Sequence, residues 1–245
     1  MKILFVILFL SGIYSIVNAQ SADTELWTGP IIKYNISKKI RVDFEQQFRF
    51  NENLTKYNYT FSELSLKYKV FKYLDIKGVY RYYFIPNEGS GIPYRTEFDK
   101  SRLSFEVSTD TKLFTSDLKL GYRIRYQKTW ETKSQVSDFF VESDLNDELF
   151  LRNKFDFSYN MSKLADPYVG WENFLRLDGI NMIKKNRYTF GVKWKLTNDL
   201  SLDSFFDLDK EINTVMPKTK YIFGLGAVYS LSYSKKNQSI DTLSP

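Results

Sequence analysis

The sequence predicts an all-β protein, an antiparallel transmembrane β-barrel of ten strands. Three observations indicate this fold: apolar and polar residues alternate along many segments, an apolar leader begins the chain, and short connections alternate with longer ones. Strands that are apolar on one face and charged on the other fit a barrel with short periplasmic turns and longer extracellular loops. Twelve strands is the alternative count.

The composition of the 245 residues favours strands at a membrane. Aromatic residues make up 18% of the chain, and they favour strands and membrane interfaces. The 35 Lys and Arg are interleaved with 29 Asp and Glu, so no basic tract predicts nucleic-acid binding. The sequence has no Cys and no His, which removes the commonest catalytic bases and metal ligands. We therefore expect no enzymatic activity and no cofactor.

The first nineteen residues, MKILFVILFLSGIYSIVNA, have the layout of a secretory signal peptide. Lys2 precedes an apolar run over residues 3–17, and Ala19 is the small residue expected at a cleavage site. Polar residues interrupt the run, which argues against a membrane anchor. We expect export, cleavage after Ala19 and location in the outer membrane.

Residues 20–37 are expected to form an N-terminal arm or a short strand. Pro30 lies within this segment, and proline has no amide hydrogen to donate to a strand ladder. Leaving the segment out reduces eleven candidate strands to ten. An even number lets both ends of a bacterial barrel lie in the periplasm.

Residues 38–233 are expected to form the barrel. The strand at 40–50, IRVDFEQQFRF, has mainly apolar residues at even positions and charged or amide residues at odd positions. A shift in this alternation near Ser62–Glu63 predicts a β-bulge. The tail at 234–245 is predicted to be disordered. The other strands are expected at 57–70, 73–85, 94–108, 117–126, 148–159, 168–177, 187–196, 200–210 and 220–233.

The charged faces are expected to point into the barrel, because each Arg or Lys facing lipid at the bilayer midplane costs about 2–4 kcal/mol. On this scheme, four neutral polar residues on the apolar faces would meet lipid: Gln46, Asn153, Asn173 and Ser204. The expected lumen-facing charges are Arg41, Asp43, Glu45, Arg49, Arg81, Arg102, Glu106, Arg123, Arg125, Arg152, Lys154, Glu172, Arg176 and Lys193.

Aromatic residues are expected near the strand ends, where they would form girdles at the level of the lipid headgroups. The expected partners are therefore outer-membrane lipids and lipopolysaccharide, and no protein partner is indicated. The girdle residues are Trp130, Trp171, Trp194, Tyr57, Tyr82 and Tyr126.

Two interpretations of the lumen are open. Inward Arg and Lys could line a narrow pore with a preference for anions, because rings of charge select ions. Alternatively, side chains of both signs fill the lumen and the role is structural, which ten strands favour.

Two further segments carry acidic residues. Those at 203–211 allow a Ca²⁺ site, or equally an acidic wall that faces basic strands. The loop at 129–147 is the longest, and its carboxylates allow contact with a partner or, through divalent ions, with lipopolysaccharide.

Five elements of the sequence carry a resemblance to a known family. They are Trp27, YNISKKIRVDFEQQFRF (34–50), GYRIRY (121–126), DPYVGWENFL (166–175) and NRYTFGVKWKLTNDLSL (186–202). Together they resemble the bacterial outer-membrane family known as domain of unknown function 2490. The resemblance spans nearly all of the mature chain and implies an outer-membrane β-barrel without a known activity, so it transfers no functional residues.

The alternative function is that of a secreted, soluble β-sandwich or barrel that binds a ligand or a protein partner.

Overall fold

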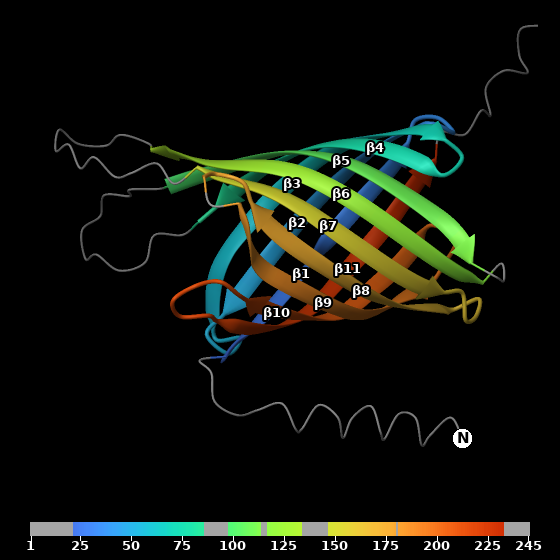
Figure 1. Cartoon of the computed structure of the whole chain (residues 1–245). Coiled ribbons are helices and arrows are strands. Elements are labelled where there is room, and N and C mark those ends of the chain that lie inside the picture. Colours follow the sequence, from blue (N-terminus) through green and yellow to red (C-terminus); the bar gives the residue numbers. More distant parts are fainter. Residues whose placement is uncertain (1–21, 86–97, 114–116, 134–146, 180, 233–245) are drawn as a thin grey trace, which may run out of the picture.

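The described residues form a closed β-barrel of eleven strands (Figure 1). The computed structural model describes residues 22–85, 98–113, 117–133, 147–179 and 181–232. Strands that follow one another in the sequence are neighbours and run antiparallel. No helix in this part of the chain is long and apolar enough to cross a membrane. The strands are β1 (Ala22–Asn35), β2 (Ile40–Asn51), β3 (Lys56–Phe71), β4 (Leu74–Phe84), β5 (Phe98–Leu113), β6 (Leu118–Lys133), β7 (Glu148–Tyr159), β8 (Ala165–Arg176), β9 (Met182–Lys195), β10 (Leu200–Glu211) and β11 (Thr219–Ser232).

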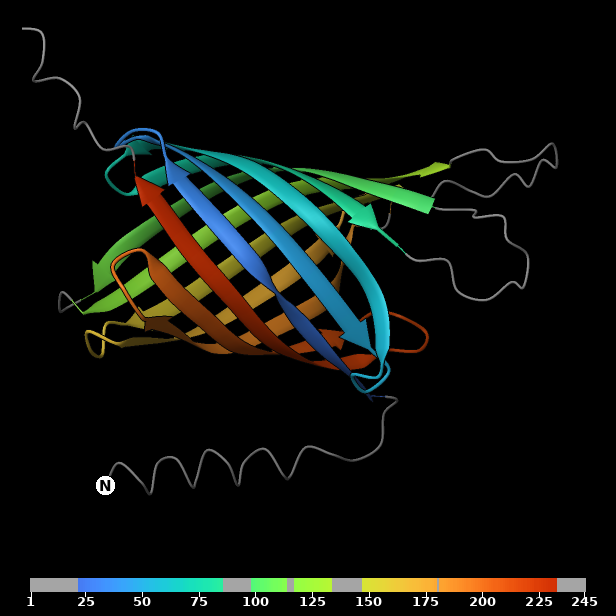
Figure 2. The ribbon, with the colours of Figure 1, turned by 180° about the vertical axis from the view of Figure 1, so that it is seen from behind.

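The barrel closes between its first and last strands, which run parallel to each other. Their register extends from Ala22 opposite Thr219 to Asn35 opposite Ser232. Figure 2 shows β1 and β11 side by side with their arrows pointing the same way. A ring of strands that alternate in direction can have an odd number of members only if one neighbouring pair is parallel. The predictions of ten strands or twelve are therefore wrong, because the barrel has eleven.

Residues 20–37 do not form an arm, because β1 is a full strand that pairs on both sides. Its ladder with β2 is interrupted only around Pro30 and resumes in the same register on either side. The neighbouring Gly29 lets the two backbones approach closely, since a Cβ at this position would lie 1.9 Å from the carbonyl oxygen of Gln46. One glycine thus allows a proline-containing segment to complete the barrel.

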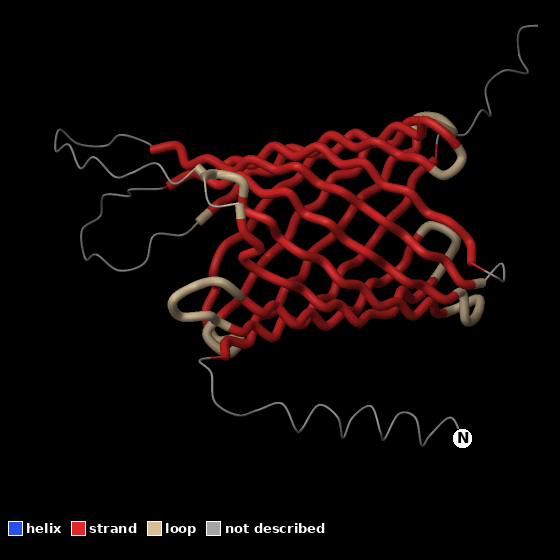
Figure 3. Tube along the Cα trace, in the orientation of Figure 1, coloured by secondary structure: helices blue, strands red, loops and turns tan. Residues whose placement is uncertain are grey.

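The connections between strands contain 4 to 14 residues at one rim of the barrel and 2 to 5 residues at the other (Figure 3). Strand β1 begins at the rim with the longer connections, and β11 ends at the other rim. We call these the long-connection rim and the short-connection rim. The described residues of the long-connection rim are 52–55, 85, 147, 177–179, 181 and 212–218, and those of the short-connection rim are 36–39, 72–73, 117, 160–164 and 196–199.

The outer face of the barrel is apolar and the inner face is charged. On the outer face, Leu64, Leu66 and Phe105 are 54%, 55% and 53% exposed. On the inner face, Glu172 and Asp209 are each 2% exposed. This arrangement is the reverse of that in a water-soluble protein, where charged groups are almost never buried unless they are paired. It is the sidedness that the alternating sequence predicts.

The pairing of β2 with β3 contains an irregularity, but not at Ser62–Glu63 as predicted. The register shifts opposite Arg49–Phe50, close to the long-connection rim. The sequence pattern was misleading because Tyr59 and Phe61 line the lumen although they are aromatic. The alternation of inner and outer positions is therefore unbroken at the place where the sequence predicts a bulge.

The neutral polar residues of the outer face bond to one another across neighbouring strands. Each of the four that the sequence analysis singled out has a side-chain partner, which lowers the free-energy cost of removing it from water. These hydrogen bonds run from Gln46 Nε2 to Thr60 Oγ1 (2.7 Å), from Asn153 Nδ2 to Asn173 Oδ1 (3.2 Å) and from Trp194 Nε1 to Ser204 Oγ (2.9 Å).

Three predictions fall wholly or mainly outside the described residues. They are the signal peptide at 1–19 with its cleavage site, the tail at 234–245, and most of the loop at 129–147. The structure places the first part of that loop, residues 129–133, in β6.

Replacement of Gly29 by alanine is expected to destabilise the closed barrel. The new Cβ would meet backbone atoms of Gln46 and Gln47, so strands β1 and β2 must separate or bend. Overpacking of this kind costs about 1–3 kcal/mol. The matched control is Gly78→Ala in β4, because a Cβ at Gly78 would meet nothing within 4 Å. Thermal unfolding followed by circular dichroism should show a lower midpoint for Gly29→Ala only, and equal midpoints would contradict the close approach.

Candidate functional site in the barrel lumen

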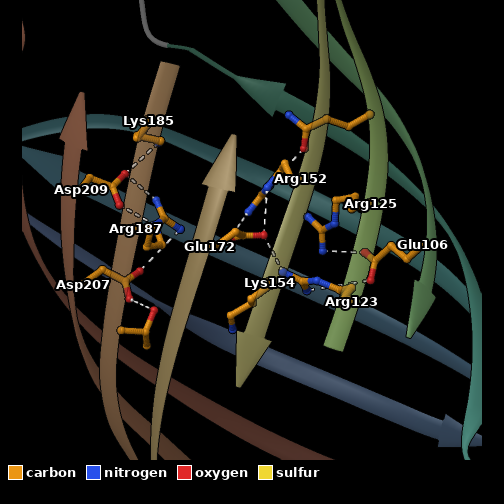
Figure 4. A network of polar contacts seen from close by, with 12 residues as sticks. Glu106, Arg123, Arg125, Arg152, Lys154, Glu172, Lys185, Arg187, Asp207 and Asp209 are labelled. Atoms are coloured by element: carbon orange, nitrogen blue, oxygen red, sulfur yellow. Dashed lines mark hydrogen bonds and ion pairs between the residues drawn. The ribbon is translucent and has the colours of Figure 1, made fainter. Parts of the chain in front are cut away.

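The structure places the predicted lumen charges on the inner face of six neighbouring strands and of β2. Those on β5 to β8 form a buried ion-pair network. Its centre is Glu172, which accepts two hydrogen bonds from Arg152 (2.7 and 3.1 Å) and one from Arg123 (2.9 Å), as Figure 4 shows. Glu106 forms ion pairs with Arg125 and, at 3.9 Å, with Arg123. Two carboxylates therefore hold three guanidinium groups and connect four strands through the lumen.

A second cluster joins β9 to β10 (Figure 4). Asp209 accepts hydrogen bonds from Arg187 (2.7 Å) and Lys185 (2.8 Å). Asp207 accepts one from the hydroxyl group of Thr189 (2.6 Å) and lies 3.5 Å from Arg187. The sequence analysis considered these aspartates for Ca²⁺, but cationic side chains engage them. Within the described ranges, no group of three or more acidic side chains is placed to hold a metal ion. The acidic wall facing basic strands is the arrangement found.

Aromatic rings alternate with arginines along the inner wall from β1 to β5. The carbon atom at the centre of the Arg49 guanidinium lies 3.5 Å from the ring centroid of Trp27 and 5.2 Å from that of Phe61. The same carbon atom of Arg81 lies 3.6 Å from the ring centroid of Phe61 and 5.8 Å from that of Tyr83. In Arg102, this carbon lies 5.2 Å from the ring centroid of Tyr83. These distances lie within the range of cation–π contacts. We call Trp27, Arg49, Phe61, Arg81, Tyr83 and Arg102 the arginine–aromatic ladder.

The alternation along the strands did not predict the rings of this ladder. Trp27 lies in the segment expected to be an arm or a short strand, and aromatic residues in general were expected on the lipid face. The available signal was that Phe61 and Tyr83 share the odd positions of their strands with Glu63, Lys67, Asp75 and Arg81, because side chains at i and i+2 lie on the same face. The same signal predicts that Arg187 and Lys185 face the lumen, because both lie at odd positions of β9, as Lys193 and Lys195 do.

The ladder is linked to the opposite clusters through shared rings. The guanidinium carbon of Arg187 lies 4.8 Å from the ring centroid of Trp27 and 5.7 Å from that of Phe174. Phe174 also contacts Arg152 at 4.2 Å and Lys185 at 4.3 Å. Cationic groups from β7 and β9 thus share aromatic partners with each other and with the ladder.

A cavity of about 740 Å³ lies in the half of the lumen nearer the long-connection rim. Every strand contributes to its wall, and it reaches solvent where the exposed Thr214 and Lys218 of the β10–β11 connection line it. Thirteen Arg and Lys line the cavity against seven Asp and Glu, so its wall carries an excess of positive charge. Such a wall favours anions.

Two arginines of the cavity wall are bound only by neutral groups. Arg49 donates hydrogen bonds to Gln47 and to the hydroxyl group of Tyr59, and Arg102 donates one to Thr129 (2.9 Å). Neither has an ion pair with a carboxylate of the described residues. By contrast, Arg81 is paired with Glu63 through a 2.8 Å hydrogen bond. Arg49 and Arg102 therefore have no carboxylate in direct contact at the cavity, although Glu45 reaches Arg49 indirectly, through Gln47.

Of the remaining predicted charges, Arg41, Asp43, Arg176 and Lys193 lie towards the two rims. Arg41 forms an ion pair with Asp43 (2.6 Å) away from the cavity, and the Lys193 ammonium lies 5.1 Å from the Tyr168 ring. At the long-connection rim, Arg176 donates a 2.6 Å hydrogen bond to Asp178, which lowers the pKa of that carboxyl group. Because Asp178 stays ionised, the Arg176 charge is neutralised at the mouth of the cavity. Glu45 and Lys154 also line the cavity.

The predicted girdle residues all lie on the outer face, but not all near a rim. Tyr57, Tyr82 and Trp130 lie within four residues of a strand end at the long-connection rim, and Trp194 lies next to the end of β9 at the other. Trp171 and Tyr126 occupy the middle of β8 and β6, so their predicted position near strand ends is wrong. The Trp171 ring is instead stacked 5.9 Å from Phe155. Outer aromatic packing therefore extends across the middle of the barrel.

A comparison with protein families places this barrel in a known family. A family model described as "Protein of unknown function (DUF2490)" matches residues 24–206, well over half of the chain. The chain belongs to this family. The DUF2490 match begins within β1 and ends within β10, so it includes the strand that the sequence analysis left out of the barrel. No curated protein matches the chain.

Removal of the Glu172 charge is expected to destabilise this DUF2490 barrel strongly. Glu172→Gln leaves Arg152 without a carboxylate in the lumen, and breaking a buried ion pair from one side costs about 3–5 kcal/mol. The matched control is Asp147→Asn, which breaks the exposed pair of Asp147 with Lys128. Exposed pairs contribute about 0–1 kcal/mol. Guanidinium unfolding curves should separate the two variants, and a small effect of Glu172→Gln would show that the network is dispensable.

Proposed function

We propose that this protein is an integral outer-membrane β-barrel with a structural or narrow-pore role. The observation that carries the proposal is an apolar outer face that encircles the barrel. Every strand except β10 exposes a large apolar side chain, and β10 contributes the half-exposed Phe206. Soluble monomers rarely expose contiguous apolar patches of more than a few hundred Å². A lipid environment accounts for such a surface without a further partner.

Strand length and backbone pairing support the same proposal. The strands contain 11 to 16 residues, and a tilted strand needs about 9–11 to cross a bilayer. Closure through β1 and β11 leaves no open sheet edge, which is the condition for a sheet in hydrocarbon. Polar side chains on the outer face are paired with one another, as lipid exposure requires.

The contents of the lumen support a narrow passage or none. Eleven strands are close to the eight at which side chains fill a barrel, and far from the 16–18 of open porins. Ion pairs centred on Glu172 and Asp209 cross-link the interior. Any ions that pass meet the positive wall of the cavity, so we expect a preference for anions. The proposal includes no catalytic role.

A soluble barrel that binds a ligand is the second candidate. The 740 Å³ cavity favours it, because ligand pockets usually measure about 300–1,000 Å³. The exposed apolar residues on the outer face count against it.

A charge placed on the outer face distinguishes the two candidates. Leu64, in the middle of β3, is 54% exposed. In a bilayer, Leu64→Arg should lower the free energy of unfolding by about 2–4 kcal/mol, whereas an exposed site in water tolerates the change to within about 0.5 kcal/mol. The control is Met161→Arg, in the short connection 160–164, where Met161 is 58% exposed. Unfolding from lipid vesicles, followed by tryptophan fluorescence, measures both, and equal stabilities would overturn the membrane proposal.

Labelling of single cysteines in intact cells tests the orientation. The natural chain has no cysteine, so each substitution introduces a unique thiol. Val215, at the long-connection rim, is 98% exposed and Tyr73, at the short-connection rim, is 63% exposed. A membrane-impermeant maleimide should label Val215→Cys in intact cells and label Tyr73→Cys only after the outer membrane is opened. Labelling of both in intact cells, or the reverse order, would contradict the proposed orientation.

A further inference from the structure

The arginine–aromatic ladder has the features of a binding site that the proposed membrane role does not explain. We propose that the cavity binds a small organic molecule carrying two oxyanion groups, with Arg49 and Arg102 as the two anion-binding residues. The proposal concerns the interior alone and goes beyond the membrane proposal. It would hold equally for a barrel in solution.

Arg49 is fixed in place yet keeps part of its hydrogen-bonding capacity. Its guanidinium lies over the Trp27 ring at 3.5 Å, while Nε donates to Gln47 (2.7 Å) and Nη1 to Tyr59. Nη2 has no protein partner within the described ranges. A guanidinium carries five N–H donors in a planar fork, which matches two oxygens of a carboxylate or phosphate. Arg49 therefore presents a preorganised edge to an anion.

Arg102 is held in a similar way on the other side of Arg81. Nε donates to the Thr129 hydroxyl group (2.9 Å), and the guanidinium carbon lies 5.2 Å from the Tyr83 ring centroid. Neither terminal nitrogen has a protein partner among the described residues, and neither is a fully buried atom. Both nitrogens are free to bind a ligand in the cavity that Arg102 lines.

These arginines have no directly paired carboxylate, in a lumen where most other arginines have one. Arg81, between them, has Glu63, and Arg152 and Arg123 share Glu172. An unpaired guanidinium in a low-dielectric interior is unfavourable. Aromatic contacts and neutral acceptors reduce that cost only in part. An anionic ligand would supply the missing charge at both places.

The spacing of the two arginines indicates a ligand with two separated anionic groups. Arg49 lies on β2 and Arg102 on β5, so their backbones are three strand spacings apart, about 14 Å along the wall, although inward-pointing side chains converge inside a closed barrel. The rings of Tyr59 and Tyr83, whose centroids are 5.7 Å apart, lie between the two guanidiniums. Arg81, which is paired with Glu63, also lies between them in the ladder, so we infer that each of the two arginines takes its own anionic group. The rings between them offer an apolar surface for the body of a longer molecule.

The cavity has the size, charge and access that such a ligand needs. Its volume of about 740 Å³ holds a small organic molecule, and its thirteen basic residues outnumber its seven acidic ones. It is open to solvent at the long-connection rim beside Thr214 and Lys218. The wall attracts an anion towards the ladder from that side.

Calorimetric titration of the folded full chain in a zwitterionic detergent tests this inference. The probes are fructose 1,6-bisphosphate, for two phosphates, and the eight-carbon dicarboxylate suberate, for two carboxylates. Neutral fructose is the comparison. Each probe has two anionic groups, and in that sense both are called dianions here, although the bisphosphate carries more than two charges. We expect saturable one-to-one binding of at least one of these dianions and none of fructose. The dianion that binds more tightly identifies the oxyanion as phosphate or carboxylate.

Variants then assign the binding to the two arginines. Arg49→Gln and Arg102→Gln should each weaken binding at least tenfold. The matched control is Arg41→Gln, because Arg41 is a lumen arginine paired with Asp43 and does not line the cavity. It should bind within twofold of the natural protein. Arg49→Lys keeps the charge but not the planar fork, and should fall between the natural protein and Arg49→Gln.

The outcomes are separable from those of the membrane tests. No saturable binding of either dianion would overturn the inference, as would equal weakening by Arg41→Gln, which would indicate attraction by net charge alone. If one glutamine variant fails to fold, the other still decides, because Arg49 and Arg102 lie on different strands. Dianion binding by a chain that does not insert into lipid would support the inference and refute the membrane proposal.

Discussion

Closure through a parallel pair of strands is the constraint on which the rest of this structure depends. Ten antiparallel contacts follow the chain, and only the pairing of β1 with β11 joins its two ends. That contact satisfies the backbone groups that the first and last strands would otherwise leave open. It also encloses the charged faces and gives the barrel an inside. Without it, the guanidinium and carboxylate groups of the inner face would be in water and their pairing would contribute little.

Once the barrel is closed, charged side chains inside it are costly unless an opposite charge or another polar partner accompanies them. Carboxylates supply this partner in most places, because Glu172, Glu106 and Asp209 each form ion pairs with at least two cationic groups. The arginine–aromatic ladder is different, because rings and neutral side chains take the place of carboxylates around Arg49 and Arg102. The positive charge thus accumulates in one cavity near the long-connection rim. The binding site proposed above uses this local excess of charge, with the ladder as the part of the lumen that would hold the anionic ligand.

The outer face depends on closure in a different way. Its polar residues are few, and they find partners on the adjacent strand only because register places them opposite each other, as it does Asn153 and Asn173. Aromatic packing of Trp171 on Phe155 likewise comes from neighbouring strands. The same pairing that organises the lumen therefore gives these polar groups of the outer face their partners, whereas Oδ1 of Asn186 on β9 has none.

The sequence by itself determined the all-β class, most strand positions and which residues face inward on β2 and β5 to β8. Alternation with period two is a local property, so Arg41 to Arg49 could be assigned to one face without knowing the fold. Only the tertiary structure decided the strand count, because whether the segment around Pro30 pairs depends on the distant strand β11 and on the space beside Gly29. The tertiary structure alone also decided which arginines are paired with a carboxylate. Arg81 and Arg102 both lie on charged strand faces in the sequence, yet Glu63 lies opposite Arg81 and not opposite Arg102. The aromatic residues Trp27, Phe61 and Tyr83 show the same limit of prediction from sequence. An aromatic side chain suits lipid and a cationic lumen equally well. Which of the two it meets depends on neighbours that are remote in sequence.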